Sequence, residues 1–176
     1  MGKLDTVAVF ADCDMTSHQA LYRKAGTIIA KNGGHLCCVA RDGQWPRALV
    51  DSALAAGGRV TVFSAHQGGT LGVPQGVSVQ LAQTANEAGV LAVGHAQAVI
   101  GLPAGIETAA ALYRAWSQAG NTTDRRPVGL LNHAKAYEIV RGFMADVASV
   151  GRGNVYTMIQ FSETFEDLWN RLTRLA

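Results

Sequence analysis

The sequence has few charged residues, and this narrows the kinds of protein to which it can belong. Only 16% of its 176 residues are charged, against roughly 25% in typical soluble domains, while 48% are hydrophobic. A chain with this much apolar material can bury a core, which excludes intrinsic disorder. Because its length is that of one ordinary domain, we expect residues 1–176 to fold as a single domain.

An excess of charge of one sign is also absent. The chain has 15 Lys and Arg residues against 13 Asp and Glu residues, so its net charge is only +2. Scattered charges of this kind form no stripe that could neutralise a nucleic-acid backbone. No apolar run approaches the ~18 residues of a membrane span, and the first residues do not resemble a signal peptide. We therefore expect a cytoplasmic protein that binds neither nucleic acid nor membrane.

Cysteine is scarce and odd in number, with residues at Cys13, Cys37 and Cys38. Neighbouring side chains on a strand point to opposite faces, so Cys37 and Cys38 cannot share a partner. We predict no disulfide framework and a reducing compartment. The histidines lack the paired spacing of metal ligands, so we also predict no metal site. They lie at His18, His35, His66, His95 and His133.

Short apolar runs alternate with segments of helical periodicity along the chain. The predicted strands are Thr6–Ala11, His35–Ala40, Arg59–Ser64, Ala98–Leu102, Pro127–Leu131 and Val155–Phe161. The predicted helices are Ser17–Lys31, Pro46–Ala56, Thr84–Ala96, Glu107–Ala119, Lys135–Val150 and Thr164–Leu175. Strands that are apolar throughout are buried on both faces, as in a parallel sheet between helices. The fold class is therefore α/β, a doubly wound parallel sheet in a Rossmann-like three-layer sandwich.

One stretch interrupts this alternation. The segment Gln67–Gly76 is rich in Gly and Gln and contains a proline. Such a segment is either a solvated connector or a loop that covers a ligand, and the composition fits both interpretations.

In an open parallel sheet, ligands bind beyond the carboxyl ends of the strands. The segment Pro103–Thr108 joins a predicted strand to a predicted helix, so its backbone N–H groups suit a phosphate. Glu107 complicates this site, because its carboxylate would repel a phosphate and could cap the same N–H groups. An anion site and a self-capped helix start both stay open. The candidate phosphate-binding residues are Arg41, Asp42, Gly43, Pro103, Ala104, Gly105, Ile106 and Thr108.

Further candidates follow other strands, at Asp12, Cys13, Asp14, His66 and His133. Asp12 and Asp14 could act as a base or contact a ribose, or they could cap the helix that begins near residue 17. Cys13 precedes the same helix, where a thiolate could be stabilised.

Arg41 directly follows the second predicted strand, and it has two possible partners. Its guanidinium could donate two hydrogen bonds to a phosphate in place of backbone donors. It could equally pair with Asp42 in a solvated turn, where an exposed ion pair contributes little to stability.

Around Ala98–Gly105 the sequence resembles the LONELY GUY (LOG) family, also labelled possible lysine decarboxylases, which includes the molybdenum-cofactor carrier protein. Similar segments span nearly the whole chain, at Val7–Phe10, Ala53–Val60, Ala98–Gly105, Arg126–Asn132 and Phe165–Leu168. The resemblance implies a bound nucleotide, phosphate or molybdopterin-type ligand, with no other cofactor required. It also implies a homodimer through the helices beside the site. Apolar residues there form such an interface or belong to the chain's own core: Val90, Leu91, Val93, Leu112, Tyr113 and Trp116.

The departures from the family pattern fall on its chemistry. The family holds a 5′-phosphate on a glycine-rich turn, where this chain has Val39–Arg41. The family's catalytic arginine and glutamate align with Ala88 and Ala111. Because general acid–base catalysis contributes about 10²–10⁴-fold, this loss implies a ligand-binding relative without phosphoribohydrolase activity, such as a carrier, sensor or partner subunit. The alternative is an N-glycosidic hydrolase with a rebuilt site, with Glu87 and Glu107 as catalytic candidates.

Overall fold

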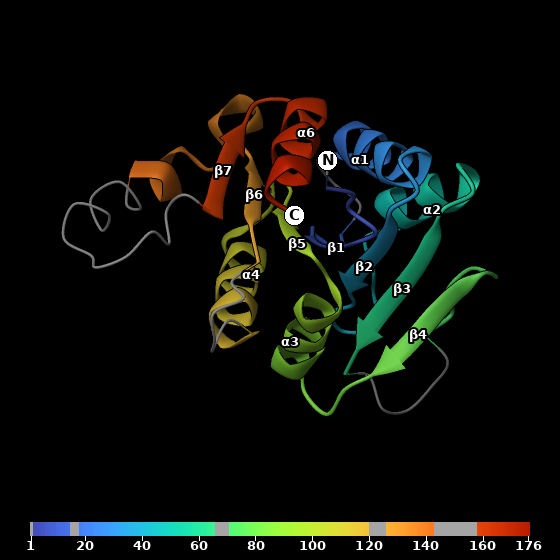
Figure 1. The fold of residues 1–176 in the computed structure, drawn as a ribbon. Coiled ribbons are helices and arrows are strands. Elements are labelled where there is room, and N and C mark those ends of the chain that lie inside the picture. The colour runs from blue at the N-terminus through green and yellow to red at the C-terminus, as the bar shows by residue number, and fades with distance from the viewer. Residues whose placement is uncertain (1, 15–17, 66–70, 120–125, 143–157) are drawn as a thin grey trace.

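The computed structural model describes residues 2–14, 18–65, 71–119, 126–142 and 158–176. In these residues, seven parallel strands form one sheet in the order β4-β3-β2-β1-β5-β6-β7 (Figure 1). The chain moves outward from β1 to β4, returns to the centre, and continues in the other direction from β5 to β7, so the predicted doubly wound sheet is confirmed. The strands are β1 (Thr6–Phe10), β2 (His35–Val39), β3 (Arg59–Ser64), β4 (Val77–Leu81), β5 (Ala98–Gly101), β6 (Val128–Leu131) and β7 (Ile159–Ser162).

Helices cover both faces of the sheet, which confirms the three-layer arrangement. The helices are α1 (Gln19–Lys31), α2 (Arg47–Ala55), α3 (Ala85–His95), α4 (Ile106–Ala119) and α6 (Phe165–Leu175). α1, α2 and α6 pack on one face, and α3 and α4 pack on the other (Figure 1). Gly33 follows α1 with a φ of 76°, as the predicted glycine stop requires.

The strands bury alternate side chains in two separate cores, one on each face. Val7 and Val9 join the core under α1, α2 and α6, while Ala8 and Phe10 join the core under α3 and α4. On β2, Cys38 belongs to the first core and Cys37 to the second. The prediction that these two thiols point to opposite faces is therefore confirmed.

The sequence prediction missed β4. This edge strand pairs only with β3 among the described strands, and its residues are mostly exposed, with Val79 at 41% and Leu81 at 63%. A strand that is not buried on both faces lacks the continuous apolar run by which the others were recognised. Gly76, with a φ of 92°, ends the Gly- and Gln-rich segment just before β4. Residues 66–70 lie outside the described residues.

The C-terminal part of the chain differs from prediction in two places. Instead of a helix from Lys135, the chain forms a 3₁₀ turn at His133–Lys135, in which Ala134 and Lys135 have positive φ values of 50° and 61°. Helix follows at 138–142. β7 begins at Ile159, and most of the predicted start of this strand lies outside the described residues.

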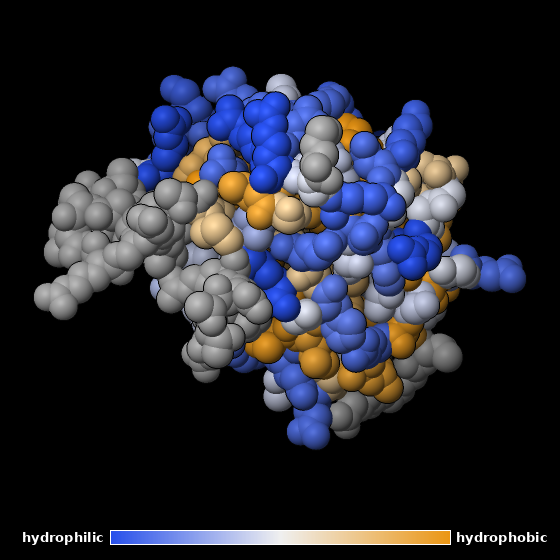
Figure 2. Space-filling model, in the orientation of Figure 1, coloured by the Kyte–Doolittle hydropathy of each residue, from blue (hydrophilic) through white to orange (hydrophobic). Residues whose placement is uncertain are grey.

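Two of the six apolar residues beside the site belong to the chain's own core, because Val93 and Leu112 are 1% and 6% exposed. Tyr113 is 60% exposed, and the other three are partly buried. In Figure 2, hydrophobic surface gathers in the lower part of the view near α3 and β4, and hydrophilic side chains dominate near α1 and α6. An interface between copies of the chain stays a prediction.

None of the described helices is long and apolar enough to span a membrane.

We predict opposite effects for one substitution at two helical glycines. A Cβ at Gly26 would collide with the Leu49 carbonyl oxygen and the Ser52 hydroxyl, because α1 and α2 pack closely there. Gly26→Ala should therefore lower the free energy of unfolding by about 1–3 kcal/mol. At Gly94, on α3, a Cβ meets nothing within 4 Å, so Gly94→Ala should raise it by about 0.5–1 kcal/mol. Urea unfolding of both variants measures these free energies. Equal changes in the two variants would contradict the close packing of α1 against α2 at Gly26.

Candidate functional site

The start of α4 carries a carboxylate supplied by the chain itself. Asp12 lies just beyond β1, and β1 is the neighbour of β5, which leads into α4. The Asp12 Oδ2 accepts a hydrogen bond from the Gly105 N–H at 2.8 Å, and its Oδ1 accepts one from the Thr108 hydroxyl at 2.5 Å. Asp12 therefore caps α4. Both of its carboxylate oxygens are used at α4, which favours this role over the alternative that Asp12 caps α1.

Tyr22 fastens the two strand ends together. Its hydroxyl donates to the Pro103 carbonyl oxygen at 2.7 Å and accepts from the Asp12 N–H at 3.0 Å. Burial raises the pKa of Tyr22 to about 12, so the hydroxyl keeps the proton that it donates. The loop after β1 is thereby tied to the turn after β5.

A tight turn after β2 presents Arg41 to α4. Arg41 and Gln44 exchange two backbone hydrogen bonds of 2.8 Å across Asp42 and Gly43, which have positive φ values of 50° and 74°. Two central residues of positive φ are the pattern of a type I′ hairpin turn. The Arg41 Nη1 donates to the Glu107 Oε2 at 2.9 Å. The predicted solvated turn is present, but Arg41 pairs with Glu107 and not with Asp42.

A hollow of 450 Å³ lies at the carboxyl ends of β1 and β2, against α3 and α4. We call it the main pocket. Its walls are mostly small or apolar, and its polar side chains include Arg41, Asn86, Glu107 and Arg114. The lining residues are Val9, Phe10, Ala11, Cys13, Val39, Ala40, Arg41, Ala85, Asn86, Gly89, Ile106, Glu107, Thr108, Ala110, Ala111 and Arg114.

A second hollow of 570 Å³, which we call the side hollow, adjoins the main pocket. Both are lined by Cys13, Arg41, Ile106 and Glu107, so the Arg41–Glu107 pair borders the two. The other residues of the side hollow are Asp12, Asp14, Asp42, Gln44 and Gly105. With 39% and 81% of their side chains exposed, Arg41 and Glu107 form a surface ion pair, which contributes at most about 1 kcal/mol and opens readily.

No protein-family model matches the sequence, and no curated protein sequence matches it. Solved structures do match. The molybdenum cofactor binding protein from the phototrophic bacterium Rippkaea orientalis superimposes with a TM-score of 0.73 at 16% identity, covering 99% of this chain and 98% of that chain. The molybdenum cofactor carrier protein from Chlamydomonas reinhardtii superimposes with a TM-score of 0.70 at 15% identity, covering 97% and 98%. This chain has the fold of the molybdenum cofactor carrier proteins.

The two alanines that align with the family's catalytic residues, Ala88 and Ala111, lie in different surroundings. Ala111 lines the main pocket, as the resemblance predicts for the position of the family's glutamate. Ala88 is fully buried in the core under α3 and is not among the residues that line the main pocket. Arg114 was missed by the sequence analysis. Its signal was its spacing of seven residues from Glu107, which places both on one face of α4.

The other acidic candidate, Glu87, takes part in capping α3. Its carboxylate accepts from the Gln83 N–H at 2.6 Å, and its own N–H donates to the Thr84 hydroxyl at 3.1 Å. The pattern resembles a capping box, except that the Glu87 carboxylate bonds the residue before the N-cap Thr84 and not Thr84 itself. Glu87 is not among the residues that line the main pocket, whereas Glu107 is.

The remaining candidates are Cys13, His133 and His66. Cys13 is partly buried, and burial raises its pKa, an effect that Arg41 offsets only in part. The expectation of a stabilised thiolate is therefore wrong. His133 is exposed after β6, and His66 lies outside the described residues. Among the side chains that the structure describes, no group of three could hold a metal ion.

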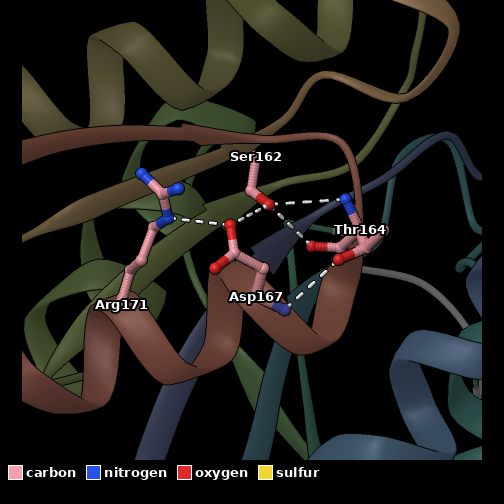
Figure 3. A network of polar contacts seen from close by, with 4 residues as sticks. All are labelled: Ser162, Thr164, Asp167 and Arg171. Carbon is pink, nitrogen blue, oxygen red and sulfur yellow. Dashed lines mark hydrogen bonds and ion pairs between the residues drawn. The ribbon is translucent and has the colours of Figure 1, made fainter.

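A further polar cluster lies at the start of α6, remote in sequence from the main pocket (Figure 3). Ser162 donates to the Asp167 carboxylate at 2.7 Å, and the Asp167 N–H donates to the Thr164 hydroxyl at 3.4 Å. The Arg171 Nε donates to Asp167 at 2.8 Å. The hydrogen bonds from Ser162 and Arg171 lower the pKa of Asp167, with Ser162 as the larger cause, and the bond to Thr164 caps the first turn of α6.

Removal of the Tyr22 hydroxyl tests the link between the strand ends. Tyr22→Phe leaves the Asp12 N–H and the Pro103 carbonyl without this partner, so the free energy of unfolding should fall by about 1–3 kcal/mol. Tyr113→Phe, at a position 60% exposed, is the control and should change it by less than about 0.5 kcal/mol. Denaturant unfolding measures both changes. If Tyr22→Phe leaves the free energy of unfolding unchanged, the Tyr22 hydroxyl does not stabilise the contact between the two strand ends.

The raised pKa of Cys13 predicts slow alkylation. Only the thiolate attacks iodoacetamide, and a pKa above 9.0 leaves a smaller thiolate fraction near neutral pH than in an unfolded chain. Peptide mapping by mass spectrometry should show a midpoint of Cys13 modification above pH 9.0 in the folded protein. The same chain in urea is the control, and equal rates in the two states would disprove the burial effect.

Proposed function

We propose that this chain binds a nucleotide-like, phosphorylated small molecule in the main pocket without cleaving its base–ribose bond. Such a protein would serve as a carrier, a sensor or a partner subunit. The observation that carries the proposal is the combination of arginines with alanine in one cavity: Arg41 and Arg114 face the same hollow as Ala111. The cavity can attract a phosphate, but its wall lacks the acid that the resemblance assigns to hydrolysis.

The shape of the pocket supports a flat ring. Its volume of 450 Å³ lies within the ~300–1,000 Å³ of ordinary small-molecule sites. Ala85, Gly89, Ala110 and Ala111 contribute little bulk, so the space between α3 and α4 stays open. Their apolar surface suits the face of a heterocycle, as expected of cofactor sites.

The charge of the pocket supports a phosphate at its rim. A guanidinium forms paired hydrogen bonds with phosphate oxygens, and both Arg41 and Arg114 line the hollow. Glu107 already holds Arg41, so a phosphate must compete with this exposed ion pair, which costs little to open. The backbone cradle of the LOG pattern is not used here, since the Arg41 N–H is bonded to Gln44.

A molybdopterin-type ligand fits the same residues, and the two solved neighbours carry the molybdenum cofactor in their names. The alanine-lined walls would take its ring system, and Arg41 and Arg114 would hold its phosphate. The cofactor would bring its own redox chemistry. The residues of this chain would bind, orient and shield it.

A hydrolase with a rebuilt site is the second candidate, and the Arg41–Glu107 pair is the observation that favours it. An arginine and an acid meet 2.9 Å apart beside the main pocket, which are the residue types that N-glycosidic cleavage requires. In this candidate Glu107 acts on the ligand and Arg41 stabilises developing charge.

One assay separates the two candidates. Purified protein incubated with a panel of nucleoside 5′-monophosphates and molybdopterin should show a raised Tm with at least one of them and no free base by chromatography. Arg114→Ala should remove the rise in Tm, because it deletes a pocket cation. Arg59→Ala is the control, since Arg59 begins β3 at the opposite end of the sheet.

Two other outcomes of this assay would contradict the proposal. Base release that disappears in Glu107→Gln would support the rebuilt hydrolase and disprove the binding-only proposal. The absence of any shift in Tm across the whole panel would contradict both candidates.

A further inference from the structure

We propose that Asp12 is a specificity-determining residue, a built-in anion that keeps ligand phosphate away from the start of α4. The inference refines the proposed function, and it rests on that function only for the statement that the ligand carries a phosphate. Its consequence concerns orientation: the phosphate lies toward Arg41 and Arg114, and a hydrogen-bond donor of the ligand, a hydroxyl or an amine, lies toward Asp12.

The start of a helix normally attracts anions because its first N–H groups have no partner within the helix. In this chain two of the donors there, the Gly105 N–H and the Thr108 hydroxyl, are already bonded. The Asp12 carboxylate spans them, with one oxygen 2.8 Å from the Gly105 nitrogen and the other 2.5 Å from the Thr108 hydroxyl oxygen. A phosphate would use two of its oxygens in the same way, so carboxylate and phosphate compete for the same donors.

Asp12 is held so that it competes well. Its own N–H is bonded to the Tyr22 hydroxyl, which is also bonded to Pro103 in the turn that precedes α4. The carboxylate therefore faces its donors before any ligand arrives. A group tethered in this way acts at a high effective concentration, which a free anion must overcome.

The surroundings of Asp12 add repulsion. The side hollow that it lines also contains Asp14, Asp42 and Glu107, with Arg41 as the only Lys or Arg among its lining residues. The main pocket has the opposite balance, with Arg41 and Arg114 against Glu107. A phosphate dianion is therefore favoured on the main-pocket side of the Arg41–Glu107 pair.

The test uses inorganic phosphate as the probe, titrated at low ionic strength and followed by calorimetry. Asp12→Asn removes the charge and keeps the size of the side chain, so it should bind phosphate at least about tenfold more tightly than the wild type. Adding Thr108→Val to this variant should abolish the gain, because it removes one of the two released donors. Asp51→Asn, on the exposed side of α2, is the control for net charge and should show no gain.

A second measurement needs no variant. In the wild-type protein, the amide signal of Gly105 should not shift when phosphate is added, whereas signals of the main pocket do. A shift at Gly105 in the wild type would overturn the inference, and so would an Asp12→Asn variant that gains no more than Asp51→Asn. Because the probe is phosphate alone, either failure leaves the binding of nucleotide-like ligands in the main pocket to its own test.

Discussion

The pairing of β1 with β5 is the constraint on which the site depends. Phe10 lies opposite Gly101, and the Leu102 N–H continues the ladder by donating to the Phe10 carbonyl oxygen at 3.0 Å. Gly101 is closely covered, because an added Cβ would lie 2.7–2.8 Å from methyl groups of Leu130 and Leu112, which would have to move. With the register fixed, the residues after β1 and the turn after β5 leave the sheet side by side. This register, together with the Tyr22 hydroxyl that bonds both segments, brings Asp12 to the start of α4.

The approach of α3 to α4 sets the width of the main pocket. Gly89 faces Ala115, where an added Cβ would come within 3.2 Å of the alanine methyl group. Small residues at this contact bring the helices together while the alanines nearer the strand ends leave a cavity between them. The pocket is therefore a product of packing, and its few charged side chains lie where the apolar walls end. This division is typical of sites that take a flat ring with a charged substituent.

Much of the fold could be predicted from the sequence, because strands buried on both faces have a clear apolar signature. The opposite orientation of Cys37 and Cys38 followed from the two-residue period of a strand. β4 could not be predicted in this way, since an exposed edge strand mixes Val and Leu with Ser and Gln. The start of α4 was recognised as a place for an anion, but the identity of that anion was not. The partner, Asp12, lies 93 residues before Gly105, and only the sheet order shows that they meet.

The partner of a side chain was harder to predict than its place at a strand end, because partners lie far apart in the sequence. The two partners considered for Arg41 were a phosphate and its neighbour Asp42, yet its partner Glu107 lies 66 residues away on α4. The turn geometry decides this outcome, because positive φ values at Asp42 and Gly43 reverse the chain and direct Arg41 back over the helix. Arg114 was overlooked because sequence inspection examined strand ends and not the later turns of the helix. Local patterns therefore pointed to the strand ends, and long-range topology determined which side chains meet there.

The exposed edge of β4 has a consequence for the behaviour of the protein in concentrated solution. Val77–Leu81 contains no lysine, no proline and no charged side chain, which are the usual means by which proteins prevent strands of separate molecules from joining. On its outer side no described strand pairs with it, and Val79 and Leu81 are solvent-exposed. Strand addition between molecules is thus favoured at this edge as concentration rises, through five residues that take no part in the pocket.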